Sequence, residues 1–456
     1  MDMPDGLKRQ IGLGPATAIV VGEMIAVGIF LTPAGMARSL GSPFWLLLVW
    51  LVMGGMAFSG ALCYGELAAR FPDAGGGYVY LRQAYGPPLA FLYGWMSFLV
   101  MDPGITAALG VGLASYAGYI VALSPLGIKV VAIGTIVGLA AANILGVRLG
   151  AGLMSGLTAI KLGLLALIAL WGFGLGLGDW SHLTPFVAQR PGSPPLLGAL
   201  AGGMVAAFFS FGGWWDLSKV AGEVREPTRT LPRALALGVL TVTLAYILTS
   251  AVFMYLVPVE RVTSDETFAA QAGEALFGRS GGLIFSTIVI ISVLGSLAGI
   301  VMSAPRVYYA MARDRVFLAA AASVHPRFGT PARAIALQAG LASGLVALGT
   351  FDDIVAYFIF MAVVFIALTV AGVFVLRRKR PDVPTYQIPA YPVVPVVFLI
   401  LVAVLLVLLV GHNPRQALLG TGVVALGVPV YYLLFRHKKG TLSHDLDSDD
   451  SAVRSG

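Results

Sequence analysis

The sequence has few charged residues and a single cysteine. Asp, Glu, Lys and Arg make up only 11% of the 456 residues, and 58% of the residues are hydrophobic, whereas a soluble domain has about 25% charged residues. Because so few charges cannot cover two or three soluble domains, the composition excludes a soluble protein and indicates a membrane protein. The one cysteine, Cys63, lies inside an apolar run, which excludes a disulfide framework and a thiolate metal site within the chain.

The chain also lacks the residue groupings of an enzyme or of a cofactor-binding protein. Its five histidines all fall between or beyond the apolar runs, and no His or carboxylate cluster has the spacing of metal ligands. No nucleophile and base are arranged for catalysis. The run DAGGG at 73–77 has no Lys-Ser/Thr after it and no strand before it, so it does not predict a nucleotide site. We therefore expect no enzyme activity, no metal and no cofactor, and a turn at 73–77 that leads to a short helix containing Arg82.

Long apolar runs indicate membrane-spanning helices. Runs such as 393–411 and 234–257 are long enough to cross a hydrocarbon core of ~30 Å, whereas a β-barrel would show segments of ~10 alternating residues. The 57 glycines suit close packing among many helices. Hydropathy and turn residues predict an all-α polytopic membrane protein with twelve transmembrane helices at about 13–37, 43–69, 87–122, 125–147, 152–177, 196–222, 234–257, 282–312, 332–350, 353–376, 392–411 and 416–435.

The positive charges predict an orientation. Most of the 29 lysines and arginines fall in loops on one side of these spans, which places both termini in the cytoplasm of a multi-pass cell-membrane protein. The formal net charge of +7 then reflects topology, and we expect no nucleic-acid partner. The predicted organisation is a cytoplasmic N-terminus at 1–12, a five-helix repeat at 13–177, a second, inverted five-helix repeat at 196–376, helices 11 and 12 at 392–435, and a disordered cytoplasmic tail at 436–456.

Two predicted spans contain residues that interrupt a helix. The first span has Gly22 and Gly28 beside a buried acid, Glu23, and the sixth has the pair Gly212–Gly213 at its middle. These are the first helices of the two halves, and each half has an odd number of spans, so the second half begins on the opposite side of the membrane. Matched interruptions in inverted halves mark a midplane binding site in secondary transporters. Unwound backbone there offers free N–H and C=O groups to a charged substrate.

Four stretches resemble the APC superfamily of amino-acid permeases, in its L-type exchanger and bacterial permease branch. They are GEMIAVGIFLTPAG in the first span, YGELAARFPDAGGGYVYLRQAYGPPLAFLYGW at 64–95, FFSFGGWWDLSKVAGEVREPTRTLPRA at 208–234 and SVLGSLAGIVMSAPRVYYAMARD at 292–314. The resemblance covers about residues 10–435. It implies the LeuT-type 5+5 inverted repeat plus two extra helices, and transport of amino acids by alternating access.

The resemblance also implies where a substrate carboxylate binds. The family's G-S-G motif in the first span falls on Ala26, Val27 and Gly28, where backbone amides receive the α-carboxylate. Two of these three positions depart from the family pattern. Backbone donors survive a change of side chain, but the serine hydroxyl is missing and Val27 is stiff and bulky.

The substrate amino group meets backbone carbonyls from both interruptions in the family. The corresponding positions lie near Met24, Phe209, Ser210 and Gly212. Phe209 matches the aromatic gate that closes over the substrate, although packing against lipid or the core would also explain an aromatic residue there.

A lysine, Lys161, lies in the otherwise apolar fifth span. A buried ammonium group needs carbonyl, hydroxyl or acid partners. In sodium-independent relatives a lysine at this place stands in for a sodium ion and links the first span to the eighth. We expect its partners to be backbone near Gly22 and hydroxyls such as those of Ser292 or Ser296, and we therefore expect sodium-independent transport. A lysine that snorkels to the membrane surface is the alternative.

Glu23 has three interpretations. An acid at the centre of a span costs about 2.5–3.5 kcal/mol on insertion scales, so it is a functional candidate by default. The carboxylate could attract a cationic substrate, exchange a proton during transport, or serve as a structural partner of Lys219.

Three charged residues lie on or just after the second half of the sixth span. Asp216 and Lys219 are three residues apart, close enough for an ion pair that is structural or part of an inner gate. Glu223 matches an acid in the inner-gate region of the family, and a solvated loop charge is the alternative interpretation.

These features favour a sodium-independent amino-acid exchanger or proton-coupled permease. A transporter of amines or polyamines with the same fold is the first alternative, motivated by Glu23 and the altered G-S-G motif. An ion channel is a more distant one, because the sequence shows no selectivity motif or ring of pore-lining polar residues. Cys63 is placed within the bilayer, and we expect no disulfide-linked partner subunit.

Overall fold

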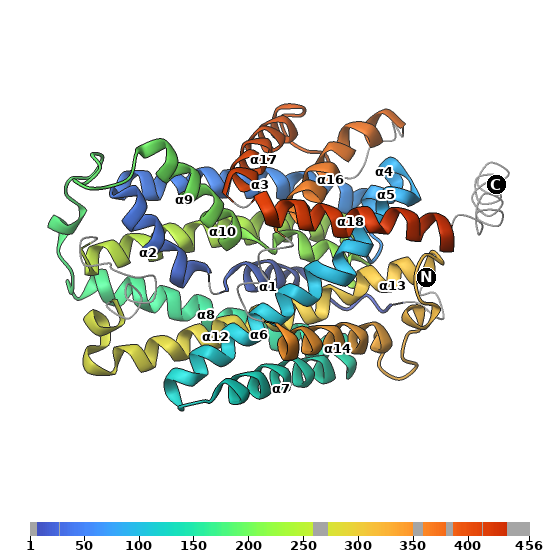
Figure 1. Cartoon of the computed structure of the whole chain (residues 1–456), viewed down its shortest axis with the longest axis horizontal. Helices are drawn as coiled ribbons and strands as arrows, with labels where there is room; N and C mark the ends of the chain where they lie inside the picture. The colour runs from blue at the N-terminus through green and yellow to red at the C-terminus, as the bar shows by residue number, and fades with distance from the viewer. Residues whose placement is uncertain are drawn as a thin grey trace.

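The computed structural model describes residues 7–26, 28–258, 272–349, 359–379, 386–412 and 414–435. These residues form a bundle of α-helices, most of which run along the long axis of the molecule (Figure 1). Over the described ranges no strand forms, and a single isolated bridge joins Ile11 to Val224. The predicted all-α architecture is confirmed.

The helices follow one another with short connections. The main ones are α1 (Leu13–Met24), α2 (Gly28–Leu40), α3 (Pro43–Arg70), α4 (Gly77–Tyr85), α5 (Pro87–Met96), α6 (Asp102–Ile120), α7 (Pro125–Ile144), α8 (Val147–Gly174), α9 (Leu196–Phe211), α10 (Pro227–Leu256), α12 (Gly281–Ser303), α13 (Pro305–Arg313), α14 (Ala332–Leu348), α16 (Ile359–Lys379), α17 (Val393–His412) and α18 (Pro414–Leu434). The short helix predicted to contain Arg82 is α4.

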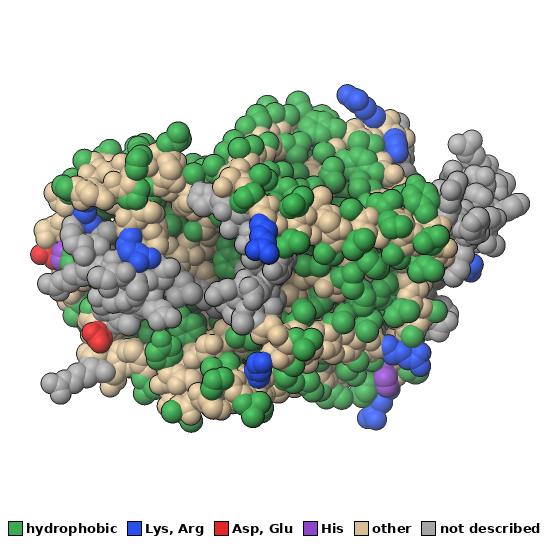
Figure 2. Space-filling model, in the orientation of Figure 1, with side chains coloured by type: hydrophobic (Ala, Val, Ile, Leu, Met, Phe, Trp, Pro, Cys, Tyr) green, Lys and Arg blue, Asp and Glu red, His purple; other side chains and the backbone are tan. Residues whose placement is uncertain are grey.

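Ten helical segments of the described chain are long and apolar enough to cross a membrane. Two further apolar helices, α1 and α14, are shorter, and the predicted span 353–376 begins outside the described residues. Hydrophobic side chains are spread widely over the face shown in Figure 2, and charged side chains are sparse there. The chain is therefore a multi-pass membrane protein, while the number of twelve spans stays a prediction.

Helix α1 lies at the centre of the bundle (Figure 1) and packs against α8, α10 and α12. Close approach of α10 depends on Gly238, where a Cβ atom would lie only 2.4 Å from Cγ1 of Val20. Small residues at such contacts let helices in a bilayer pack tightly. The central position brings the end of α1, including Glu23, into the interior.

Both predicted interruptions are present. Helix α1 ends at Met24 and α2 begins at Gly28, so the first span is two separate helices. Helix α9 ends at Phe211, and the chain continues after the glycine pair as a 3₁₀ helix, η3 (Trp214–Glu223). Gly213 has φ +105°, and a Cβ there would lie 3.1 Å from Cβ of Glu23, so both its conformation and its contact with α1 favour glycine.

The third predicted span contains an irregularity that the sequence did not predict. A five-residue π-helical turn, η1 (Ser97–Met101), separates α5 from α6. Such turns insert one residue into a helix and are frequent at functional sites. The turn places Asp102, the first residue of α6, in the interior with no exposed surface.

Candidate functional site

A cavity of about 680 Å³ lies against the two interruptions. Its walls come from α2, α6, α9, α12 and α16, together with the end of α1 and the start of η3. It is lined by most of the predicted substrate-binding residues, namely Glu23, Met24, Ala26, Gly28, Phe209, Ser210 and Gly212. Val27 lies outside the described residues. The structure thus brings together, at one cavity, residues from parts of the sequence nearly 200 positions apart.

The start of α2 is one wall of this cavity. A Cβ atom at Gly28 would lie 2.6 Å from Oγ of Ser210, so glycine lets α2 approach α9 closely. The Ser210 hydroxyl donates to Oγ1 of Thr32 at 2.8 Å, which ties the two helices together. The first N–H groups of a helix have no intrahelical partner, and the N-terminus carries a partial positive charge. This wall therefore suits a carboxylate.

Tyr246 on α10 lies behind the two interruptions. Its hydroxyl oxygen is 2.7 Å from the carbonyl oxygen of Met24 and 2.7 Å from that of Ser210. One hydroxyl therefore contacts backbone carbonyls at the ends of both α1 and α9. These are two of the carbonyls predicted to lie near the substrate amino group. Tyr246 could not be predicted from the sequence, because a tyrosine in an apolar span gives no signal that distinguishes it from a packing residue.

Lys161 on α8 is fully buried, and its ammonium group joins three helices. It donates to the carbonyl oxygens of Gly22 and Ile25 at 2.7 Å each, and to that of Ser292 at 2.9 Å. The Ser296 hydroxyl lies 3.3 Å away and itself donates to Gly22. Of the two serines expected beside the lysine, Ser296 contributes its hydroxyl and Ser292 contributes its backbone carbonyl. A snorkelling lysine is excluded by its burial.

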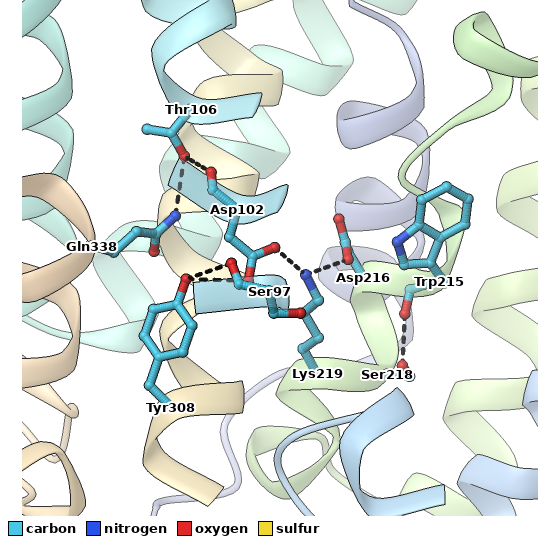
Figure 3. Close-up of polar contacts among 9 residues, drawn as sticks. All are labelled: Ser97, Asp102, Thr106, Trp215, Asp216, Ser218, Lys219, Tyr308 and Gln338. Atoms are coloured by element: carbon cyan, nitrogen blue, oxygen red, sulfur yellow. Dashed lines mark hydrogen bonds and ion pairs between the residues drawn. The ribbon is translucent and has the colours of Figure 1, made fainter. Parts of the chain in front are cut away.

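Lys219 and two aspartates form a second buried group (Figure 3). The ammonium nitrogen lies 2.9 Å from Oδ1 of Asp102 and 2.8 Å from Oδ1 of Asp216. The expected ion pair between Lys219 and Asp216 is therefore present, and Asp102 is a second acid paired with the same lysine. The Tyr308 hydroxyl donates to the other Asp102 oxygen at 3.2 Å. Asp102 is absent from the residues predicted for the site, although an acid in the middle of an apolar run before Pro103 is a signal in the sequence.

Glu223 forms a buried ion pair with Arg306 of α13. Nε and Nη2 of the guanidinium group lie 3.1 Å and 2.9 Å from the two carboxylate oxygens, which is the bidentate geometry of a strong charge pair. The Glu223 carbonyl also accepts from the backbone N–H groups of Gln10 and Ile11. Interpreting Glu223 as a solvated loop charge is therefore wrong, since neither side chain of the pair is exposed.

Glu23 has no ion-pair partner among the described residues. Its side chain is 7% exposed, and neither carboxylate oxygen has a hydrogen-bond partner. Lys219 makes its ion pairs with the two aspartates, so the interpretation of Glu23 as its structural partner is wrong. Across the described chain, no group of three or more His, Cys, Asp or Glu side chains could hold a metal ion.

A glycine on α12 makes the space for the Glu23 side chain. A Cβ atom at Gly299 would lie 2.5 Å from Cγ of Glu23, whereas one at Gly282 of the same helix would meet nothing within 4 Å. We expect Gly299→Ala to lower the free energy of unfolding by about 1–3 kcal/mol through overpacking, and Gly282→Ala to raise it by at most about 1 kcal/mol, because alanine is the better helix residue where space is open. Thermal unfolding of the two purified variants measures the difference. Equal melting temperatures would contradict the packing described here.

Comparison with known proteins gives consistent matches over nearly the whole chain. A family model described as amino acid permease matches residues 11–435. The serine/threonine exchanger SteT of Bacillus subtilis is 32% identical over 95% of this chain and 98% of its own length. The large neutral amino acids transporter small subunit 2 of Homo sapiens is 31% identical over 95% and 82%, and the human b(0,+)-type amino acid transporter 1 is 29% identical over 82% and 77%.

The family match agrees with the geometry of the site. Two broken helices meet at a buried cavity, one of them presents a helix N-terminus, and a buried lysine holds the break in place. These features suit a carrier of small charged solutes and include no catalytic group. The chain belongs to the amino acid permease family of membrane transporters.

Proposed function

We propose that this permease is a sodium-independent exchanger of amino acids, in which the ammonium group of Lys161 takes the place of a coupling sodium ion. The observation that carries the proposal is the set of three carbonyl contacts made by Lys161 at 2.7–2.9 Å, on α1 and α12. A fixed cation supplies at that point the charge that a bound sodium ion would supply. Binding of the substrate then needs no second ion.

The cavity suggests how an amino acid binds. The α-carboxylate is received at the start of α2 by backbone N–H groups, starting with that of Gly28. The amino group lies near the carbonyls of Met24 and Ser210, which Tyr246 also contacts. Phe209, whose side chain is 44% exposed, lines the cavity and covers the substrate on closure.

The positions of the buried ion pairs support an assignment of the side of the membrane to which the cavity opens. Beyond the cavity, towards the end of η3, the chain is held by the Lys219–Asp102 and Arg306–Glu223 ion pairs. With both termini in the cytoplasm, as the positive loops favour, these pairs close the inner side and the cavity opens outwards. The two inverted repeats at 13–177 and 196–376 are the bodies that move against each other, and 392–435 supplies the additional helices.

The carrier works without a disulfide-linked partner subunit in this proposal. Cys63, the one cysteine of the chain, is buried within α3 and has no exposed surface. One of the similar proteins, the large neutral amino acids transporter small subunit 2, is named as a subunit, but no thiol of this chain reaches the surface for a disulfide link to a partner.

Counterflow in proteoliposomes tests the proposal. Vesicles preloaded with unlabelled amino acid are expected to take up labelled amino acid faster than empty vesicles, because each outward step of the carrier requires a cargo. A panel of neutral and cationic amino acids and their decarboxylated amines identifies the substrate class. Uptake of amines alone would indicate an amine carrier instead, and flux without stimulation by preloading would indicate a proton-coupled permease or a channel.

A further inference from the structure

Glu23 is the one acid of the cavity whose charge no neighbouring group matches. Its carboxylate lines the cavity, yet it is 7% exposed and accepts no hydrogen bond from the described residues. The Asp216 carboxylate and the Ser303 hydroxyl lie close by. An ionised carboxylate buried without a donor or counter-charge is costly. The group therefore needs either a proton or a cation from the cavity.

The charged groups around Glu23 also leave its carboxylate without a counter-charge. The charged groups that face it are Lys161 on α8 and Asp216 and Lys219 on η3, and Lys219 also contacts Asp102 on α6. From α12 it meets the Ser303 hydroxyl, and on α10 the Tyr246 hydroxyl is bound to the backbone carbonyl of Met24, the residue that follows Glu23. Two lysines balance two aspartates. The cluster is neutral when Glu23 is protonated and carries one negative charge when Glu23 is ionised.

We propose that Glu23 is a cation-exchange site: it holds a proton when no cationic substrate is bound and gives up that proton when a cationic amino acid enters the cavity. The proton leaves a carboxyl oxygen of Glu23 for the water of the cavity, and the substrate's side-chain ammonium or guanidinium group takes its place beside the carboxylate. The inference rests on the proposed function, because the same cavity must first bind an amino acid.

The exchange keeps the buried charge constant. A neutral amino acid with protonated Glu23 and a cationic amino acid with ionised Glu23 give the binding site the same total charge. Both complexes therefore cross the membrane interior at a similar electrostatic cost. One site could thus carry both classes of substrate, with a proton exported only for the cationic class.

Proton flux during transport tests this proposal. Full-length protein is reconstituted in vesicles that contain a pH-sensitive dye and unlabelled L-serine as the internal exchange substrate, and L-lysine or L-serine is added outside. Lysine uptake is expected to make the lumen more alkaline, because the carrier returns with a proton, whereas serine exchange is expected to leave the lumen pH unchanged. The KM for lysine is expected to rise as the pH falls from about 8 to about 5.5, since protons compete for Glu23.

Glu23→Gln removes the exchangeable proton without changing the size of the side chain. We expect the ratio of lysine to serine uptake to fall about tenfold or more, as loss of a charge-assisted contact implies, and the remaining lysine uptake to lose its pH dependence. Glu23→Asp is expected to keep the proton movement. Glu274→Gln, at an exposed position outside the cavity, is the matched control and is expected to behave as the unsubstituted protein.

The outcomes separate this inference from the proposed function. Lysine uptake without a change in lumen pH, or with a KM independent of pH, would overturn the cation-exchange site, and so would serine uptake with no lysine uptake. Amino acid exchange would stand in each of these cases. Absence of uptake of any amino acid would instead overturn the proposed function. If Glu23→Gln does not yield folded protein, the proton flux of the unsubstituted protein alone decides.

Discussion

Lys161→Ala is expected to lower the rate of amino acid exchange by about 100-fold or more. The ammonium group contacts the last carbonyls of α1 at Gly22 and Ile25 and the Ser292 carbonyl on α12. Each hydrogen bond to a charged group contributes about 1.5–3 kcal/mol, and the loss of two such bonds corresponds to a factor of 100 or more. Without the lysine, the carbonyls at the end of α1 lose their hydrogen-bond donor, so the end of α1 is no longer held in position against α12.

Initial rates of exchange in proteoliposomes with equal amounts of protein measure this effect. The control is Lys129→Ala, because the Lys129 ammonium also donates to a backbone carbonyl, that of Ala347, but at an exposed position. The control is expected to keep the rate of the unsubstituted protein. A rate for Lys161→Ala within about twofold of the control would show that the fixed cation is dispensable.

Lys219→Met is expected to lower the free energy of unfolding by about 3–5 kcal/mol. The side chain of Lys219 is 1% exposed, and its ammonium group forms ion pairs with both Asp102 and Asp216. Removing one partner of a buried ion pair leaves an unmatched charge in a medium of low dielectric constant, which is the costly case. Methionine fills a similar volume, so the substitution leaves little empty space and the loss of packing contributes little to the change in stability.

Denaturant titration of the purified protein in detergent measures this change. The double variant Lys219→Met with Asp102→Asn removes one of the two unmatched acids and is expected to recover part of the loss. The same loss in the single and double variants would contradict an electrostatic origin. A single variant as stable as the unsubstituted protein would show that the ion pairs contribute nothing.

The features that could be predicted from the sequence have local signals. Both interruptions could be predicted because glycines, singly in the first span and as a pair in the sixth, are unfavourable in a helix interior. Lys161 was noticed because a charge in an apolar run is rare. The all-α membrane architecture followed from composition and from the length of the apolar runs, which do not depend on tertiary contacts.

The features that were missed depend on contacts between distant residues. Asp102 and Lys219 are 117 residues apart, and Glu223 and Arg306 are 83 apart, so spacing along the chain could not pair them. The π-helical turn that precedes Asp102 has no reliable sequence signature. Glu223 could be interpreted as a loop charge because Arg306 was not known to lie beside it. Charge pairing inside a bundle is decided by how its helices pack.

The site combines one fixed cation with one unmatched acid. Lys161 holds the broken first span with contacts to backbone alone, whereas Glu23 lies at the same interruption with no donor. The first supplies a constant charge, and the second supplies a charge that depends on proton or substrate. In this account a bound sodium ion has no place at the interruption.

Amino acid exchange measured with and without sodium tests this central claim most directly. Vesicles preloaded with a mixture of neutral and cationic amino acids are placed in labelled amino acid with sodium chloride, or with choline chloride at the same concentration. The account predicts equal initial rates in the two media, because the Lys161 ammonium group already occupies the position of the cation. Exchange that requires sodium would contradict it.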